Sequence, residues 1–255
     1  DSHYKDLPLM LHEYTSKGQY GEYFTGENNL DETKNLHCIE LKAGSDNLRP
    51  IIVFSMLLFI GQQVFRGDRN KYKAIVIEEF KLFQHIKHSY VRESMEKYIL
   101  EVRKYNAGII TITQAISHYY ENDFMQQFYE LADIKYILEQ EPEVIAKMES
   151  NKIEGFSKYE IAKLKTFRPS RDYGFSSILV KRDKAANVMR LFLSPEDKIL
   201  TTTHGDELGY LQNLRNQGLP LHEQINKAAW HFYADDMGRF GNYKSKYYGE
   251  LNEKV

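Results

Sequence analysis

Two apolar runs of strand length, separated by one helical segment, most constrain what this chain can fold into. The runs are YKAIVI (72–77) and AGIITITQ (107–114). The first is apolar nearly throughout, which is typical of strands that are buried on both faces inside a parallel sheet. Between the runs, apolar residues from Val91 to Tyr105 recur at helical spacing. Strand, helix and strand in this order predict an α/β fold with a mainly parallel sheet flanked by helices.

Further segments extend this pattern on both sides. The segment from Asp46 to about Phe65 predicts a helix, and because it is apolar almost all round we expect it to be internal. Residues 36–42 (LHCIELK) and 134–138 (IKYIL) predict two more strands. Residues 174–194 predict a β-hairpin at the edge of the sheet.

Shorter helical patterns fill the second half of the chain. They lie near residues 144–148 and 159–164, and Ser157 with Glu160 predicts a capping box at the start of the second one. Residues 204–234 predict C-terminal helices, and the polar, Tyr-rich segment after them has no clear period.

Composition narrows the class of protein. The 255 residues are 42% hydrophobic and 27% charged, with a net charge of −2 and a pI of about 6.6. A dedicated nucleic-acid module is usually more basic, although local basic patches remain open. The run IIVFSMLLFIG (51–61) is shorter than the roughly 20 residues that a membrane span requires. The single cysteine, Cys38, excludes an internal disulfide, and the start of the chain lacks the pattern of a signal peptide.

Polar groups follow both apolar runs at the point where each strand should end. Glu78 and Glu79 follow the first, and the second ends in Thr111, Thr113 and Gln114. Ligands of open α/β sheets bind at the carboxyl ends of the strands, so these groups would share one crevice if the strands are neighbours. A nucleotide-hydrolysing site places a Mg²⁺ carboxylate, a general base and a polar sensor there. A solvated acidic turn is the simpler alternative.

The sequence lacks the phosphate-binding loop of such enzymes. A P-loop requires G-x-x-x-x-G-K-[ST], and none of the 15 glycines is followed by lysine. Either the chain is no ATPase, or it is a piece of one whose phosphate loop lies upstream. In both cases we expect these 255 residues alone to hydrolyse no ATP.

Several motifs, taken in order, resemble one family. The chain is similar to the C-terminal part of the TraC-like conjugative-transfer ATPases, the motor ATPases of type IV secretion systems, over roughly residues 7–234. The motifs that carry the resemblance are GQYGEYFTG (18–26), HCIELK (37–42), IVIEEF (75–80), ILEVRKYNAGIITITQ (99–114), RLFLSPEDKILTTTHGDE (190–207) and GLPLHEQINKAAWHFY (218–233).

The resemblance implies a division of the chain. Residues 1–30 would be the end of a helical insertion, and residues 31–203 the C-terminal part of a RecA-like P-loop ATPase core. Residues 204–234 would form C-terminal helices and residues 235–255 a polar tail. The Walker A segment would precede residue 1.

The resemblance also implies roles for individual residues. Glu78 would hold Mg²⁺, through water, in the position where the family usually has Asp. Glu79 would be the general base, and Gln114 would sense the γ-phosphate of ATP. Arg103 would reach the nucleotide of a neighbouring subunit, although a cation at a helix C-terminus is favourable for dipole reasons alone. Thr25 replaces an acid that often follows Phe24 in the family, which weakens any role for that loop.

The implied function is a motor that powers pilus assembly and substrate transfer, with ATP and Mg²⁺ as cofactors. Its partners would be other copies of itself in a ring, and inner-membrane and cytoplasmic components of the secretion channel. The implied location is cytoplasmic, peripheral to the bacterial inner membrane. Two alternatives stay open, a non-catalytic assembly module and a DNA-translocating RecA-type coupling ATPase.

Direct nucleic-acid binding is not settled by the sequence. Arg168 and Arg171 lie in the loop FRPSRDYG, where they would face a phosphate or simply solvent. The many Tyr and Phe residues favour core and interface packing over stacking on bases, since no basic groove is evident.

Overall fold

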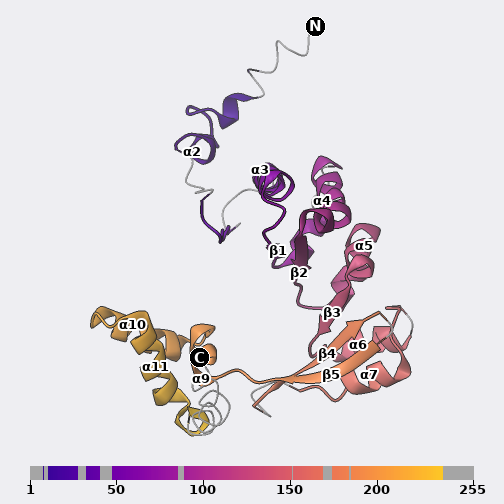
Figure 1. The fold of residues 1–255 in the computed structure, drawn as a ribbon, viewed down its shortest axis with the longest axis vertical. Coiled ribbons are helices and arrows are strands. Elements are labelled where there is room, and N and C mark those ends of the chain that lie inside the picture. Colours follow the sequence, from indigo (N-terminus) through magenta and orange to yellow (C-terminus); the bar gives the residue numbers. More distant parts are fainter. Residues whose placement is uncertain are drawn as a thin grey trace. The chain divides into compact units, whose positions relative to one another are not determined.

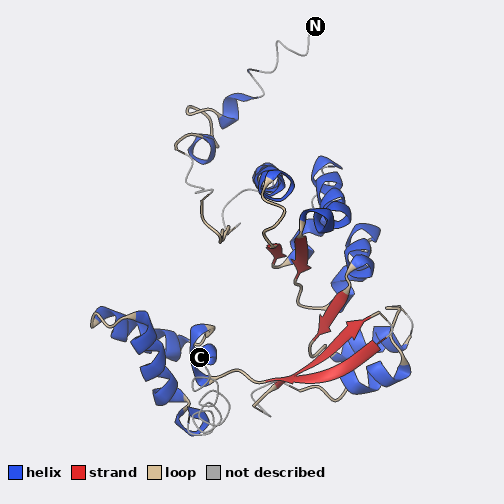
Figure 2. Cartoon of the chain, in the orientation of Figure 1, coloured by secondary structure: helices blue, strands red, loops and turns tan. Residues whose placement is uncertain are grey.

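The computed structural model describes residues 8, 11–27, 33–40, 48–85, 89–150, 152–168, 174–183 and 185–237. The chain divides into two units, each with its own core. Unit 1 contains residues 1–114 and 118–131, and unit 2 contains residues 115–117 and 132–255. Figures 1 and 2 show the helices and strands of both units.

Unit 1 is built around a two-stranded parallel sheet. Its elements are η1 (His12–Tyr14), α2 (Gly21–Phe24), α3 (Arg49–Gly61), the π-helical η2 (Gln62–Arg66), β1 (Lys73–Ile77), η3 (Phe80–His85), α4 (Ser89–Glu101), η4 (Val102–Tyr105), β2 (Ala107–Thr111), η5 (Ile116–Tyr120, whose first two residues belong to unit 2) and α5 (Asp123–Leu131).

The two strands are direct neighbours. β1 and β2 pair in parallel, with Lys73 opposite Ala107 and Ile77 opposite Thr111. The crossover between them contains α4, as the strand–helix–strand pattern predicts. The parallel pair is therefore confirmed, and both strands end at the same edge.

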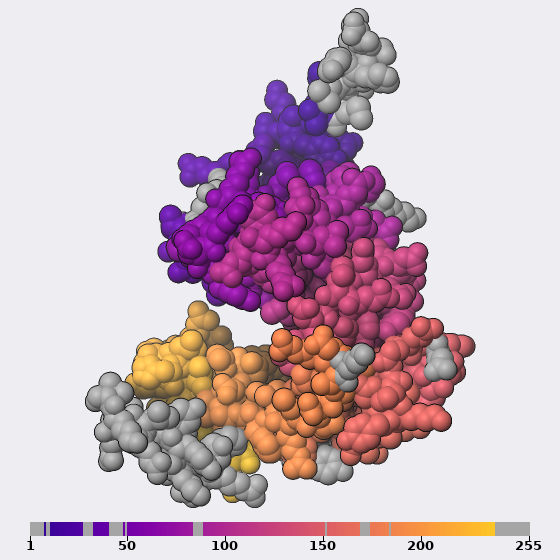
Figure 3. Space-filling model, turned by 45° about the vertical axis from the view of Figure 1, so that its right-hand side comes forward, coloured from indigo at the N-terminus to yellow at the C-terminus, as the bar shows by residue number. Residues whose placement is uncertain are grey.

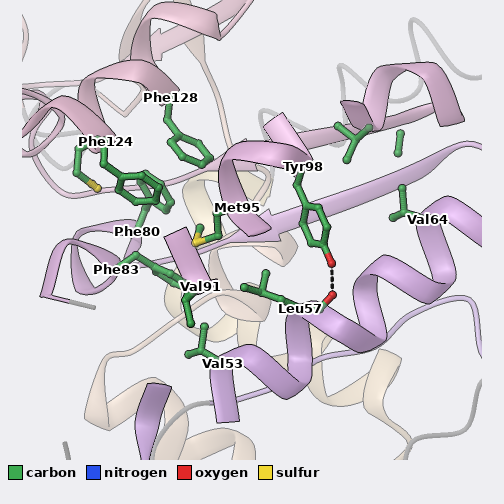
Figure 4. Close-up of a cluster of buried hydrophobic side chains, with 13 residues drawn as sticks. Val53, Leu57, Val64, Phe80, Phe83, Val91, Met95, Tyr98, Phe124 and Phe128 are labelled. Atoms are coloured by element: carbon green, nitrogen blue, oxygen red, sulfur yellow. Dashed lines mark hydrogen bonds between the residues drawn. The ribbon is translucent and has the colours of Figure 1, made fainter. Parts of the chain in front are cut away.

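One face of this sheet carries the core of unit 1. Side chains from α3, α4, α5 and η3 gather there around Phe80, which is fully buried (Figure 4). Phe80 packs against Phe83, Phe124 and Phe128, with ring centroids 4.7 to 6.4 Å apart. The Tyr98 hydroxyl, on α4, donates a hydrogen bond to a backbone carbonyl of α3, which ties these two helices together.

The opposite face of the sheet is largely uncovered, which corrects one prediction. Val76 is 58% exposed and Ile110, its partner in the register, is 51% exposed. The apolar run predicts burial on both faces, but a run cannot show whether a second layer is present. The described residues supply a layer on only one side.

Helix α3 lies where the sequence predicts a helix, but it is not buried on all sides. It begins at Arg49, with Pro50 in its first turn, where a missing backbone N–H costs nothing. Val53 and Leu57 are buried, whereas Leu58 is 54% exposed. The prediction that this helix is internal is therefore wrong for its outer side. The predicted strand at 36–42 is also wrong where it can be seen, since residues 36–40 form no strand and 41–42 lie outside the described residues.

Unit 2 contains a three-stranded antiparallel sheet of order β3-β4-β5 (Figure 2). The expectation of a mainly parallel sheet is thus wrong, because in the described part of the chain only β1 and β2 pair in parallel. The strand at 134–138 pairs with the hairpin instead of continuing the parallel sheet. The elements are β3 (Ile134–Ile137), α6 (Pro142–Glu149), α7 (Lys158–Leu164), β4 (Ser176–Arg182), β5 (Ala185–Leu191), α9 (Pro195–Leu200), α10 (Gly205–Asn216) and α11 (Leu221–Phe232).

Two sequence predictions in unit 2 are confirmed. β4 and β5 form the predicted hairpin, and Ser157 with Glu160 forms the predicted capping box at α7. Glu160 also pairs with Lys181 of β4 at 2.7 Å, with both side chains nearly buried. Burial alone would raise the pKa of Glu160, but hydrogen bonds from Lys181 and Ser157 outweigh it and hold this pKa below its usual value.

The C-terminal helices form a small core of their own. Ile199 of α9 packs with Ala228 and Ala229 of α11. The Tyr233 hydroxyl donates to Glu207 at 2.7 Å, and burial together with this carboxylate raises the pKa of Tyr233 to about 12. Residues 238–255, most of the predicted tail, lie outside the described residues. No helix in the described ranges is long and apolar enough to cross a membrane.

Candidate active site

The acidic pair lies directly after β1, where the strand ends at Ile77. The backbone continues to pair with the neighbouring strand for a short distance. Ile112 donates its N–H to the Ile77 carbonyl at 2.9 Å, and Phe80 donates to the Ile112 carbonyl at 2.9 Å. Glu78 and Glu79 are therefore held between two backbone anchors at the carboxyl edge of the sheet.

The structure brings two predicted site residues into contact. Gln114 Nε2 donates a hydrogen bond to Glu79 Oε1 at 2.8 Å, although the two residues are 35 positions apart. The contact forms because β1 and β2 are parallel neighbours whose carboxyl ends coincide. The sequence predicts that these strand-end groups lie together, and within unit 1 Glu79 and Gln114 do so at the exposed surface.

Glu79 has an unusual backbone conformation. Its φ is +49°, in the left-handed region that non-glycine residues rarely adopt. Such a conformation costs about 1 kcal/mol or more and persists only where the surroundings enforce it. The next residue, Phe80, is fully buried and its N–H donates to the Ile112 carbonyl, so the chain is held directly after the turn. The turn aims the Glu79 side chain toward Gln114, and no sequence signal predicts this, because glutamate is not a typical left-handed residue.

Glu78 is the free carboxylate of the pair. It is exposed, and among the described residues it forms no hydrogen bond or ion pair. Mg²⁺ in nucleotide sites is bound by one or two protein carboxylates, with water and phosphate oxygens completing the shell. Glu78 fits that requirement. The described residues contain no cluster of three or more His, Cys, Asp or Glu side chains that could hold a metal without such help.

The threonines at the end of the second strand are occupied by local partners. Thr111 Oγ1 lies 2.8 Å from the Tyr119 hydroxyl, and Thr113 Oγ1 lies 2.6 Å from His118 Nδ1. Burial raises the pKa of Tyr119. These contacts leave Gln114 as the strand-end side chain that faces the acidic pair. Sequence reasoning missed Tyr119, which follows the strand without any periodic pattern.

Arg103 lies at the other end of the sheet. It belongs to η4, just before the first residue of β2, whereas Gln114 follows the last residue of that strand. Arg103 and Glu79 are therefore not brought together within one chain. The predicted action of Arg103 on a neighbouring subunit's nucleotide stays a prediction.

The lysine that follows the acidic pair is partly neutralised. Lys81 Nζ lies 3.4 Å from Glu121 Oε1, and both side chains are about one-third exposed. Lys81 thus pairs with Glu121, and within the described residues neither Glu78 nor Glu79 forms an ion pair.

The fold and this site define an α/β protein with a carboxylate pair and a glutamine at the carboxyl ends of two parallel strands. No family model matches the chain. The chain is similar to Protein TraC of Escherichia coli (strain K12), at 28% identity over 232 residues. The alignment covers 88% of this chain and 26% of TraC, so the chain spans about a quarter of the length of that relative. The resemblance that the motifs predict is confirmed.

Proposed function

We propose that this chain is part of an ATP-hydrolysing motor of the TraC kind, which powers conjugative pilus assembly and substrate transfer through a type IV secretion system. The observation that carries the proposal is the Glu79–Gln114 hydrogen bond beside Glu78, at the ends of two adjacent parallel strands. The similarity to TraC supports it.

In this proposal each site residue has one task. Glu78 would hold Mg²⁺ through water, and the ion would supply positive charge opposite the phosphates. Glu79 accepts the proton of the attacking water. Gln114 holds the Glu79 carboxylate in one orientation and is placed to sense the γ-phosphate.

The phosphate loop would come from a segment beyond these 255 residues. No G-x-x-x-x-G-K-[ST] occurs in the sequence, and the chain spans about a quarter of TraC. With that segment the unit would complete a RecA-like P-loop core. The partners proposed are copies of the same protein in a ring and components of the secretion channel, at the cytoplasmic side of the inner membrane.

A specific observation also supports the alternative of a non-catalytic assembly module. The uncovered sheet face with Val76 and Ile110 is apolar, and such surfaces commonly bind another protein segment. This alternative assigns no chemistry to the acidic pair, so the same experiment separates the two.

The test measures ATP turnover of the longer protein that contains this chain. Glu79→Gln should lower kcat by about 100-fold or more, because a general base contributes that much. Glu93→Gln is the matched control, since Glu93 is an exposed carboxylate on α4 that is not one of the proposed site residues. Unchanged turnover in Glu79→Gln would favour the assembly module. The 255-residue chain alone should show no turnover.

A further inference from the structure

Unit 2 has a cavity that the proposed ATPase chemistry does not use. It encloses about 500 Å³ between α7, the segment after it, and the β4–β5 hairpin. Figure 1 shows α7 beside the two strands, and the hairpin belongs to the orange part of the space-filling view in Figure 3. The cavity is large enough for a ligand of the size of one nucleotide.

Three cations line this cavity: Lys163 from α7, Arg168 just after it and Arg190 from β5. None of the described residues that line the cavity is acidic. Within the described ranges, none of the three forms an ion pair with a carboxylate, whereas Lys165 of the same unit pairs with Glu149 at 2.6 Å. Their charge is available to an anion.

Arg168 is held in place without losing its binding capacity. Its Nη1 donates to the Lys165 carbonyl at 2.9 Å and to the Phe167 carbonyl at 2.7 Å. A guanidinium has five N–H donors, so the remaining ones can bind phosphate oxygens. The turn that follows α7 therefore fixes a cation at the cavity wall.

Aromatic rings accompany the cations. Arg190 Cζ lies 4.7 Å from the Phe175 ring centroid, and Lys163 Nζ lies 5.3 Å from that of Tyr159. Tyr159 is 61% exposed. Exposed aromatic rings and guanidinium planes are the surfaces on which unpaired bases stack.

We propose that this cavity binds single-stranded nucleic acid, with Lys163, Arg168 and Arg190 at the phosphates and Tyr159 stacked on a base. The net charge of −2 does not oppose this, because the cations are concentrated at one place. An acidic peptide would satisfy the cations but would leave the exposed tyrosine ring without a role. The proposal does not depend on ATP hydrolysis, since it involves residues of unit 2 only.

The experiment is a fluorescence anisotropy titration of a labelled oligothymidylate of about 12 nucleotides, a length that spans one binding module, with the 255-residue chain. The double variant with Lys163→Ala and Arg190→Ala should bind about tenfold more weakly. Its plot of log affinity against log salt concentration should be shallower by about 1.4, since two phosphate contacts are lost. Lys147→Ala with Arg182→Ala is the matched control. Both residues are exposed cations of unit 2 outside the cavity, and this pair should leave affinity and slope unchanged.

The stacking contact is tested without any change of charge. Tyr159→Leu should weaken binding about fivefold or more, the smallest loss typical of a stacked base. Tyr136→Leu is the control, because Tyr136 is an equally exposed tyrosine on β3 outside the cavity. Circular dichroism and the thermal midpoint show whether each variant is folded.

Four results would overturn the proposal. The first is that the unsubstituted chain does not bind the probe, and the second is that the cavity and control variants lose affinity equally. The third is that polyglutamate displaces the probe as readily as unlabelled oligothymidylate does. The fourth is that free ATP competes with the probe at equal nucleotide concentration. The last two would assign the cavity to an acidic peptide or a mononucleotide instead.

Discussion

Unit 1 and unit 2 use their strands in opposite ways, and their surface chemistry differs accordingly. In unit 1 two parallel strands end at one edge, which gathers Glu78, Glu79 and Gln114 there. In unit 2 three antiparallel strands lie beside α7, and cations from the helix and the hairpin face one cavity. The parallel sheet thus concentrates chemistry at strand ends, whereas the antiparallel sheet presents it along its side.

The largest expected loss of stability is in the aromatic core of unit 1, and it is compared with the loss at an exposed ring in unit 2. Phe80→Ala should lower the free energy of opening of β1 by about 3–5 kcal/mol, because it removes a fully buried ring that also anchors the turn at Glu79. Amide hydrogen exchange of residues 73–77 measures this energy. Phe192→Ala, at an exposed ring of unit 2, should lower the free energy of unfolding of unit 2 by about 1 kcal/mol or less. Equal losses in the two variants would contradict the described core.

The ion pair of unit 2 should give the next largest effect. Lys181→Met leaves the nearly buried Glu160 carboxylate without its partner, which should cost about 3 kcal/mol. Urea unfolding followed by the fluorescence of Trp230, the single tryptophan and a residue of unit 2, measures it.

The same pair gives unit 2 a pH dependence. The pKa of Glu160 is lower in the folded state, so its stabilisation is present above the unfolded pKa of roughly 4.3 and is lost as the pH falls through the folded pKa. The free energy of unfolding of the unsubstituted chain should therefore fall more steeply below about pH 5 than that of Lys181→Met. Parallel pH curves would show that the pair does not perturb Glu160.

The capping box should contribute less than the ion pair. Ser157→Ala removes one hydrogen bond at the start of α7 and should cost about 1 kcal/mol by the same tryptophan measurement. Ser150→Ala is a suitable control, because the Ser150 hydroxyl binds only a backbone carbonyl at the exposed end of α6.

The smallest expected loss of stability is on the uncovered face of the parallel sheet, and it is compared with the loss on the face that packs against the core. Val76→Thr, on the uncovered face, should change stability by about 0.5 kcal/mol or less, since the side chain is already largely in water. Ile75→Thr, on the face that packs against the core, should cost clearly more. Similar costs at both positions would mean that a second layer covers Val76 in solution.

The sequence predicted what depends on local pattern. The strand–helix–strand order, the start of α3, the hairpin and the capping box all follow from periodicity and turn chemistry, and the pairing of Glu79 with Gln114 follows from parallel adjacency. The separate antiparallel sheet could not be predicted in this way, because strand length and hydrophobicity do not specify pairing partners. The left-handed Glu79 and the exposure of Val76 depend on tertiary packing and were missed for that reason.

The central claim is that Glu79 and Gln114 act as one unit at the strand ends, and a double-mutant cycle on ATP turnover tests it most directly. In the longer protein we expect Glu79→Gln and Gln114→Ala each to lower kcat, and the double variant to be about as slow as Glu79→Gln alone, because residues that act together are not additive. Additive losses would show that the 2.8 Å contact has no role in turnover. Turnover that survives both substitutions would contradict the account altogether.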